Sequence, residues 1–400
     1  MTSGKVGALF LVYTAVALGW IALGGEVGYR TQTSERDLQP LVENLWGAPI
    51  TQFAPVMTVE SRPENDKNAK PVVHAVEPDS SDIKVNLHLD FRRKGLLWYR
   101  TYVVDFDATY TVKHQIEGLT DLLVKVALPT TRGTYDNFLF SVNDETGLPA
   151  GGAGDWTLSH RIGLAKGDTA TVRLRYTTRG LDQWAYKFAQ EVAAVKDFRL
   201  AMTTDFSGFD FPTLSPTSKV DTGHGWELAW DFASHISGLE VAIEMPERLN
   251  PGPLAARISL FAPVGLLFFL SVMAIVGMVK SRNMHPMHYL FVCAAFFAFH
   301  LLFAYLVDLI EINVAFVVSA VVSVLMVASY VVRFMGPRYT FLMVAPAQLL
   351  FLVVFSYAFF FQGYTGLTIT IAAIITLAAM MHITAKVDWD EKLGKKPATR

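Results

Sequence analysis

The last third of the chain contains five long apolar runs with very short segments between them. The runs cover residues 258–279, 286–307, 313–332, 340–361 and 366–384. A helix of ~20 residues, rising ~1.5 Å per residue, spans the ~30 Å hydrocarbon core of a bilayer. Each run is long enough to cross a membrane as a helix. The sequence therefore predicts an integral membrane protein with a five-helix transmembrane bundle near its C-terminus.

Basic residues are unevenly distributed among the short loops that separate these runs. Lys280 and Arg282 lie in the first loop, Arg333 and Arg338 lie in the third, and the tail after residue 386 is also basic. The second and fourth loops contain neither Lys nor Arg. Short loops rich in Lys and Arg are retained on the cytoplasmic side of a membrane. The first loop, the third loop and the C-terminus are thus predicted to be cytoplasmic, and the chain is predicted to reach residue 254 from outside the cytoplasm.

An additional apolar run at residues 6–25 follows Lys5. It could be a cleaved signal sequence, since small residues at its end loosely resemble a cleavage site, or an uncleaved anchor helix. The run is longer than the ~7–15 apolar residues of a signal core, which favours the anchor. Both alternatives export the segment that follows. With an uncleaved anchor, the N-terminus is cytoplasmic as well.

A short amphipathic helix is predicted at residues 34–46. Ser34 and Asp37 have the spacing of a capping box, and apolar residues then recur at helical spacing on one face. Such a helix could lie on the bilayer surface or pack against the domain that follows. Pro49 is predicted to end it.

The pattern from residue 83 to residue 243 is that of a β domain. Nine segments show alternation of apolar and polar residues or enrichment in β-branched and aromatic residues. They cover residues 83–89, 98–112, 122–128, 138–142, 156–162, 169–177, 198–204, 226–230 and 239–243. A possible helix at residues 183–195 interrupts the series. Many short strands separated by turn residues predict a β-sandwich.

The predicted domain boundaries follow from these patterns. Asn250-Pro251-Gly252-Pro253 stiffens the chain where it re-enters the membrane. The resulting fold class is an α+β membrane protein. Its parts are an anchor at 1–25, a periplasmic β-rich domain at 26–253, a transmembrane bundle at 254–386 and a cytoplasmic tail at 387–400.

Charge and cysteine content exclude several classes of protein. The net charge of −2 gives no indication of a nucleic-acid partner. Cys293 is the only cysteine, so the periplasmic domain must be held together without a disulfide. Six histidines fall in that domain, and none has the spacing of a helical metal site. They are His74, His88, His114, His160, His224 and His235. No catalytic, cofactor or metal site is predicted, and the protein is not expected to be an enzyme.

The ionisable residues of the transmembrane bundle are the candidate functional residues. His300 lies ~21 Å along the helix that starts at Pro286, well inside the hydrocarbon region. Ionisable residues at this depth often mark ion or proton pathways, but a neutral histidine donating one hydrogen bond to another helix is an equally simple explanation. Asp308 and Glu311 lie in the loop after this helix. They could form the outer mouth of such a pathway, or they could be loop carboxylates without a special role.

Several motifs together resemble the CreD family of bacterial inner-membrane proteins. The most specific is the sequence Asn283-Met284-His285-Pro286-Met287-His288-Tyr289, which leads into an apolar helix. Others are the basic turn Arg92-Arg93-Lys94-Gly95, the segment Gly225-Trp226-Glu227-Leu228-Ala229-Trp230 and the terminal Val387-Asp388-Trp389. Within the motif, His285, Pro286 and Met287 are the family residues to be located, and Pro286 suits the first turn of a helix.

The resemblance implies a bacterial inner-membrane protein linked to envelope integrity and stress tolerance, and it supplies no catalytic residues. The first expectation is a non-enzymatic protein whose periplasmic domain binds an envelope component or a partner protein beside the lipid bilayer. The alternative is a transporter or a proton-coupled signalling protein that uses His300. The sequence leaves the ligand and the oligomeric state open.

Overall fold

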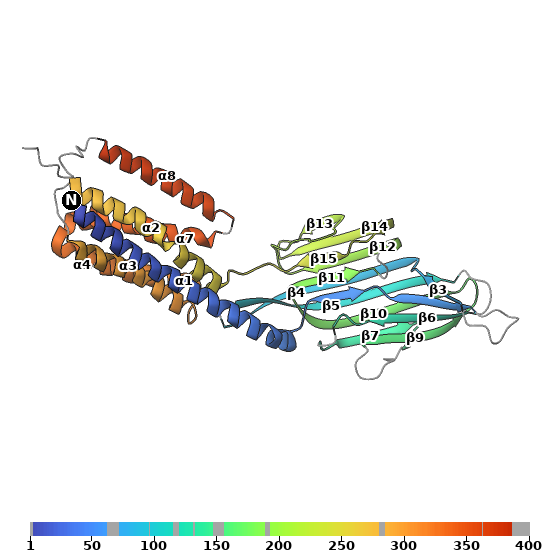
Figure 1. The fold of residues 1–400 in the computed structure, drawn as a ribbon. Coiled ribbons are helices and arrows are strands. Elements are labelled where there is room, and N and C mark those ends of the chain that lie inside the picture. The colour runs from blue at the N-terminus through green and yellow to red at the C-terminus, as the bar shows by residue number, and fades with distance from the viewer. Residues whose placement is uncertain are drawn as a thin grey trace, which may run out of the picture. The chain divides into compact units, whose positions relative to one another are not determined.

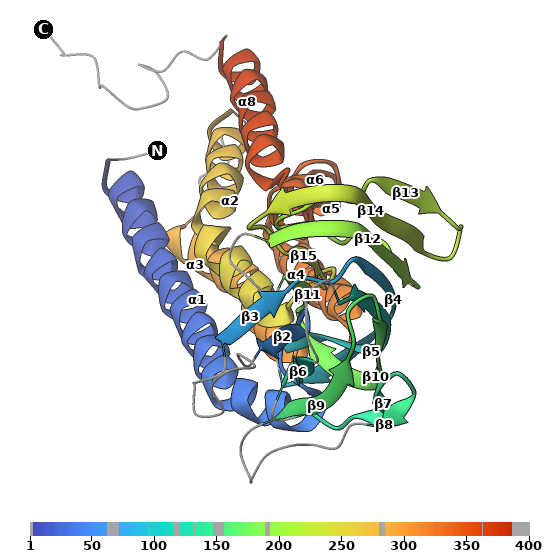
Figure 2. The same ribbon diagram turned by 90° about the vertical axis from the view of Figure 1, so that its right-hand side faces the viewer.

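The computed structural model describes residues 3–61, 72–95, 97–114, 120–130, 133–146, 156–188, 193–279, 285–361 and 363–385. The chain forms two compact units, which are labelled by their helices and strands in Figures 1 and 2. The helical unit comprises Met1–Arg36, Gly95–Leu97 and Leu249–Arg400. The β unit comprises Asp37–Lys94 and Trp98–Arg248. The combination of several apolar helices with a sheet-rich unit is that of a mixed helix and sheet membrane protein.

The first helix, α1, is a single helix of 44 residues from Ser3 to Trp46. The expectation of an anchor followed by a separate helix at 34–46 is therefore wrong. Nothing between the two predicted segments stops a helix, because residues 26–33 contain no proline and only one glycine, Gly28, which costs only ~1 kcal/mol. At ~1.5 Å per residue, α1 is ~66 Å long, about twice the thickness of a hydrocarbon core. Only part of it can lie within a membrane.

The remaining helices are α2 (Pro251–Val279), α3 (Pro286–Leu306), α4 (Ile312–Met335) and α8 (Thr365–Thr384), with a composite helical segment between α4 and α8. In the described part of the chain, six helical segments are long and apolar enough to cross a membrane. Large apolar side chains fill the centre of the helical unit, among them Phe269, Phe296 and Leu352. The number of long apolar helices thus agrees with the sequence pattern.

The composite segment departs from the regular α-helix expected at 340–361. It consists of α5 (Pro337–Tyr339), η1 (Thr340–Val344), α6 (Ala345–Gln348), η2 (Leu349–Val354), α7 (Phe355–Tyr357) and η3 (Ala358–Phe360). Both η1 and η2 are π-helical. Pro346 lies between them and has no N–H with which to continue an α-helical ladder, which favours a local change of helix type.

The β unit contains fifteen strands among its described residues, in three sheets. The eight-stranded sheet has the order β13-β14-β12-β4-β5-β10-β7-β8. Its strands are β13 (Ser218–Asp221), β14 (Trp226–Ser237), β12 (Ala193–Thr204), β4 (Ser80–Lys94), β5 (Leu97–Lys113), β10 (Thr169–Leu181), β7 (Asp136–Val142) and β8 (Glu145–Thr146). The second sheet has the order β3-β2-β6-β9. Its strands are β3 (Val72–Val76), β2 (Val56–Ser61), β6 (Thr120–Ala127) and β9 (Thr157–Leu164).

The third sheet joins β1 (Ile50–Phe53), β11 (Gln183–Lys187) and β15 (Val241–Glu244) in the order β1-β11-β15. The possible helix at 183–195 is wrong, because β11 and the beginning of β12 occupy its described residues. Trp184, Ala185 and Tyr186 are consecutive and all buried. This continuous burial gives no period-2 signal, since successive side chains point to opposite faces and both faces of β11 are covered.

One apolar core is shared by the three sheets. It includes Val59 from the four-stranded sheet, Trp184 from the three-stranded sheet and Phe106 from the eight-stranded sheet. Buried residues alternate with exposed ones in the first part of β4 and with half-buried ones along most of β5, as the sequence predicts for strands with one face on a core. The opposite face of the eight-stranded sheet carries charged and polar side chains.

Candidate functional site

His300 is buried in the helical unit among aromatic rings. Its ring centroid lies 5.3 Å from that of Trp20 in α1 and 4.8 Å from that of Phe299. Its Nδ1 lies 3.2 Å from the carbonyl oxygen of Phe296, one turn earlier in the same helix. Among the described residues, neither His300 Nε2 nor Trp20 Nε1 has a hydrogen-bond partner. The hydrogen bond expected between helices is thus replaced by one within α3.

Asp308 and Glu311 each take part in a local contact. Asp308 forms an ion pair of 2.9 Å with Arg30 of α1, and the Arg30 guanidinium lies 5.9 Å from the ring centroid of Tyr305. Glu311 is the N-cap of α4 and accepts hydrogen bonds from the backbone amides of Asn313 and Val314 at 2.9 and 3.0 Å. The ion pair links α1 to the segment that follows α3, and Glu311 caps the N-terminus of α4. Whether the two carboxylates also form the mouth of a pathway stays a prediction.

The family motif forms the beginning of α3. His285 is the N-cap, and its Nδ1 accepts a hydrogen bond of 3.3 Å from the Met287 amide. Pro286 occupies the first turn. N–H groups of the first turn have no carbonyl partner within the helix, so the N–H that proline lacks costs no helical hydrogen bond. Asn283 and Met284 lie outside the described residues. The next histidine, His288, was not predicted to have a role, yet its Nδ1 lies 2.8 Å from the Tyr330 hydroxyl of α4.

A hydrogen-bonded group inside the helical unit was missed by the sequence reasoning. The Ser323 hydroxyl donates to the Ala295 carbonyl at 2.7 Å, and Gln348 Nε2 donates to Ser323 Oγ at 3.1 Å. Gln348 is fully buried, and its Oε1 has no partner among the described residues. A glutamine inside an apolar run is a signal that could have identified this group, because buried amides require partners.

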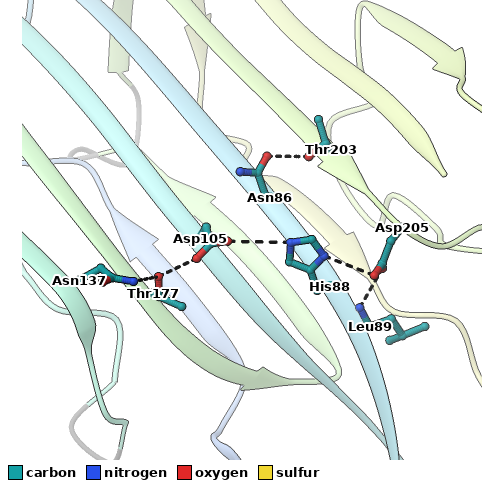
Figure 3. Close-up of polar contacts among 8 residues, drawn as sticks. All are labelled: Asn86, His88, Leu89, Asp105, Asn137, Thr177, Thr203 and Asp205. Atoms are coloured by element: carbon teal, nitrogen blue, oxygen red, sulfur yellow. Dashed lines mark hydrogen bonds and ion pairs between the residues drawn. The ribbon is translucent and has the colours of Figure 1, made fainter. Parts of the chain in front are cut away.

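The polar face of the eight-stranded sheet brings together a histidine and two carboxylates. Figure 3 shows His88 of β4 between Asp205 and Asp105, with its Nδ1 3.3 Å from Asp205 and its Nε2 3.9 Å from Asp105. The Thr177 hydroxyl donates to Asp105 at 2.6 Å. These side chains are about half exposed and bond to one another. They stabilise strand pairing across the sheet and leave few hydrogen-bond donors or acceptors available to a ligand.

Two cavities lie beside β3 in the β unit, and we call them together the edge cleft. The first, which we call the aromatic cavity, has a lining that includes Val56, Met57, Tyr186, Phe188 and Phe198. Its volume is about 570 Å³ including space open to solvent. The second has a volume of about 670 Å³ on the same measure. Its lining includes Asp79, Lys113, His114 and Lys196. The space in them that a water-sized atom can enter is only about 60 Å³ in the first and about 220 Å³ in the second, so both are small pockets in the surface.

The two cavities share the segment Ala75–Glu77, at the end of β3. Ala75 is exposed, whereas Glu77 is half-buried. The carboxylate of Glu77 has no hydrogen bond or ion pair among the described residues. Burial raises its pKa above the ordinary value for glutamate. An unpaired carboxylate that is partly removed from water destabilises the fold, which is typical of a residue kept for binding.

We expect Glu77→Gln to stabilise the β unit slightly at neutral pH. Because the folded pKa of Glu77 is raised, the folded protein binds more protons than the unfolded chain, and its stability falls as pH rises through this pKa. The amide carries no charge and lacks this penalty, so the gain should be below about 1 kcal/mol for a half-exposed group. Thermal unfolding of the two proteins between pH 4 and pH 8 should show a difference that vanishes at the acidic end. A stability difference between the two proteins that did not change with pH would show that the charge of Glu77 is not its cause.

The edge cleft could not be found from the sequence. Its lining includes residues of β2, β3, β4, β5, β6, β9, β11 and β12, several of which are distant from one another along the chain. The one local signal is Glu77 itself, a carboxylate directly after the valine that ends β3.

The two units together define a multi-pass membrane protein with a large β-rich unit and a cleft in it. Residues 239–390 match the family model described as inner membrane protein CreD. The match covers α2 to α8 together with β15, and it confirms the resemblance carried by the His-Pro-Met motif. Over these residues the chain is similar to the CreD family.

Solved structures give weaker similarities. A Legionella pneumophila protein provisionally described as nutrient binding is 11% identical, with a TM-score of 0.30, over 62% of this chain and 83% of its own. An M1 zinc metallopeptidase from Deinococcus radiodurans is 11% identical, with a TM-score of 0.26, over 41% of this chain and 42% of its own. Similarities this low carry no conclusion about function. Among curated proteins, no significant match to the chain is found.

Proposed function

We propose that this protein supports cell-envelope integrity and stress tolerance in the bacterial inner membrane, by non-enzymatic binding through its β unit. The CreD family match supports the membrane setting, and the basic residues in the cytoplasmic loops support a periplasmic β unit. The observation that carries the binding proposal is the edge cleft. It combines an aromatic cavity with the unpaired carboxylate of Glu77. The helical unit then acts as the membrane platform.

Filling the edge cleft is expected to abolish function without unfolding the protein. In Ala75→Trp, an exposed alanine that lines both cavities is replaced by a side chain large enough to obstruct them. The substituted position is in an edge strand, where an aromatic residue is well tolerated. Survival of a deletion strain under detergent challenge should therefore fall to that of the empty vector, with the membrane level of the protein unchanged.

The matched control is Ala233→Trp. Ala233 is also an exposed alanine in a strand of the β unit, but it belongs to β14 and lines neither cavity. This variant should rescue as well as the wild type. If Ala75→Trp rescued equally well, binding in the edge cleft would not be the function of the β unit.

The alternative is a transporter or a proton-coupled signalling protein that uses His300. The alternative is favoured by the buried Nε2 of His300, which has no hydrogen-bond partner among the described residues and lies in a ring next to Trp20, since such an atom can bind water or a proton in transit. The binding proposal predicts that His300→Leu rescues the deletion strain at wild-type membrane level. Loss of rescue with normal insertion would instead make the helical unit the active part.

A further inference from the structure

The edge cleft lies beside a strand with a free edge. Among the described residues, β3 pairs only with β2, and it forms one border of the four-stranded sheet. Along β3, the side chains of Val73, His74 and Ala75 are all exposed. Half of the N–H and C=O groups of such a strand point away from its partner and can pair with another chain. An added strand would thus find backbone donors and acceptors at this edge.

The aromatic cavity provides a place for one side chain of that added strand. Tyr186, Phe188 and Phe198 form its aromatic wall, and their rings contact one another with centroids 5.3 to 5.8 Å apart. All three are buried in the core, so the wall is rigid. A rigid apolar cavity beside an open strand edge is the arrangement used in peptide recognition by strand addition, where backbone bonds give affinity and a pocket gives specificity.

Glu77 supplies the charge that the added strand must complement. Its carboxylate follows β3 directly and belongs to both cavities. A lysine or arginine side chain of a ligand would provide the ion pair that the described residues do not. Residues two apart in an extended peptide lie ~7 Å from each other on the same face. An apolar residue and a basic residue with this spacing can therefore face the cavity and Glu77 together.

We infer that the edge cleft binds a peptide segment in extended conformation, with an apolar side chain in the aromatic cavity and a basic side chain at Glu77. This inference rests on the proposed function and names its ligand class. A lipid could fill the apolar cavity, but it has no regular series of backbone donors and acceptors to match β3. The strand edge therefore favours a peptide.

The test uses the full chain in lipid nanodiscs and a fluorescein-labelled hexapeptide, Thr-Val-Phe-Val-Lys-Thr. Two analogues carry N-methyl groups at alternate residues, so that each blocks one edge of the extended peptide. Fluorescence anisotropy should show binding of the parent peptide and at least about tenfold weaker binding of one analogue only. Glu77→Gln should weaken binding of the parent peptide about tenfold, while an analogue with norleucine in place of lysine should bind both proteins equally.

Exposed Glu227 of β14 provides the control, and Glu227→Gln should leave every affinity unchanged. Absence of parent-peptide binding, or equal binding of both N-methylated analogues, would overturn the inference. If Ala75→Trp nevertheless failed to rescue the deletion strain, the proposed function would stand with another ligand. Binding of dihexanoyl phosphatidylglycerol in that case would identify a lipid. Rescue by Ala75→Trp would count against both proposals.

Discussion

Replacing Gly47 by alanine is expected to destabilise the β unit by about 3 kcal/mol or more. Gly47 ends α1 with a φ of +101°, a conformation that side chains rarely adopt. A Cβ built at this position would lie 2.3 Å from the backbone carbonyl oxygen of Arg179. Because that carbonyl belongs to β10, it cannot move without disturbing the eight-stranded sheet. The loss should appear as a lower unfolding temperature when thermal unfolding is monitored by tryptophan fluorescence.

The control for Gly47→Ala is Gly167→Ala. Gly167 has a similar φ of +95°, but a Cβ there would have no heavy atom within 4 Å. This variant tests the backbone strain alone and should cost about 1 kcal/mol. Equal losses in the two variants would mean that the contact with Arg179 does not contribute.

Gln52→Leu is expected to have the second large effect, a loss of about 2–4 kcal/mol. Gln52 is fully buried in β1 and makes hydrogen bonds to two other sheets. Its Oε1 accepts from the Tyr176 hydroxyl of β10 at 2.7 Å, and its Nε2 donates to the Ala127 carbonyl of β6 at 3.4 Å. Leucine fills similar volume but leaves the buried Tyr176 hydroxyl without this acceptor. Thermal unfolding of the full chain measures the loss.

The double variant Gln52→Leu with Tyr176→Phe isolates the hydrogen bond. Tyr176→Phe removes the hydroxyl that Gln52→Leu leaves unsatisfied, so the second substitution should restore part of the stability lost in the first. If the double variant lost the sum of the two single losses in stability, the side chains of Gln52 and Tyr176 would not be energetically coupled.

Much of this architecture follows from local sequence. The apolar runs predict the positions of the long helices, because transmembrane segments are defined by their own length and hydrophobicity. Each of the nine predicted strand segments overlaps a strand, since the period-2 pattern is a property of each strand by itself. The start of α3 at His285 and Pro286 is equally local, because a cap is formed by neighbouring residues.

Other features depend on contacts between distant residues. The sequence analysis missed β1, β2, β3, β8, β11 and β13, most of which are short. The ion pair between Arg30 and Asp308 and the edge cleft also join segments far apart in the chain. No local pattern records such pairs.

The sequence by itself therefore determined the membrane class, the resemblance of residues 239–390 to the CreD family and most of the order of helices and strands. Only the tertiary structure decided which strands share a sheet. It also places an edge of β3, and the carboxylate of Glu77 beside an aromatic cavity, where no other described residue pairs with them. The physical reason is the range of the forces involved. Helix formation, strand alternation and membrane partition act on neighbouring residues, whereas a cleft exists only after close packing has brought distant side chains together.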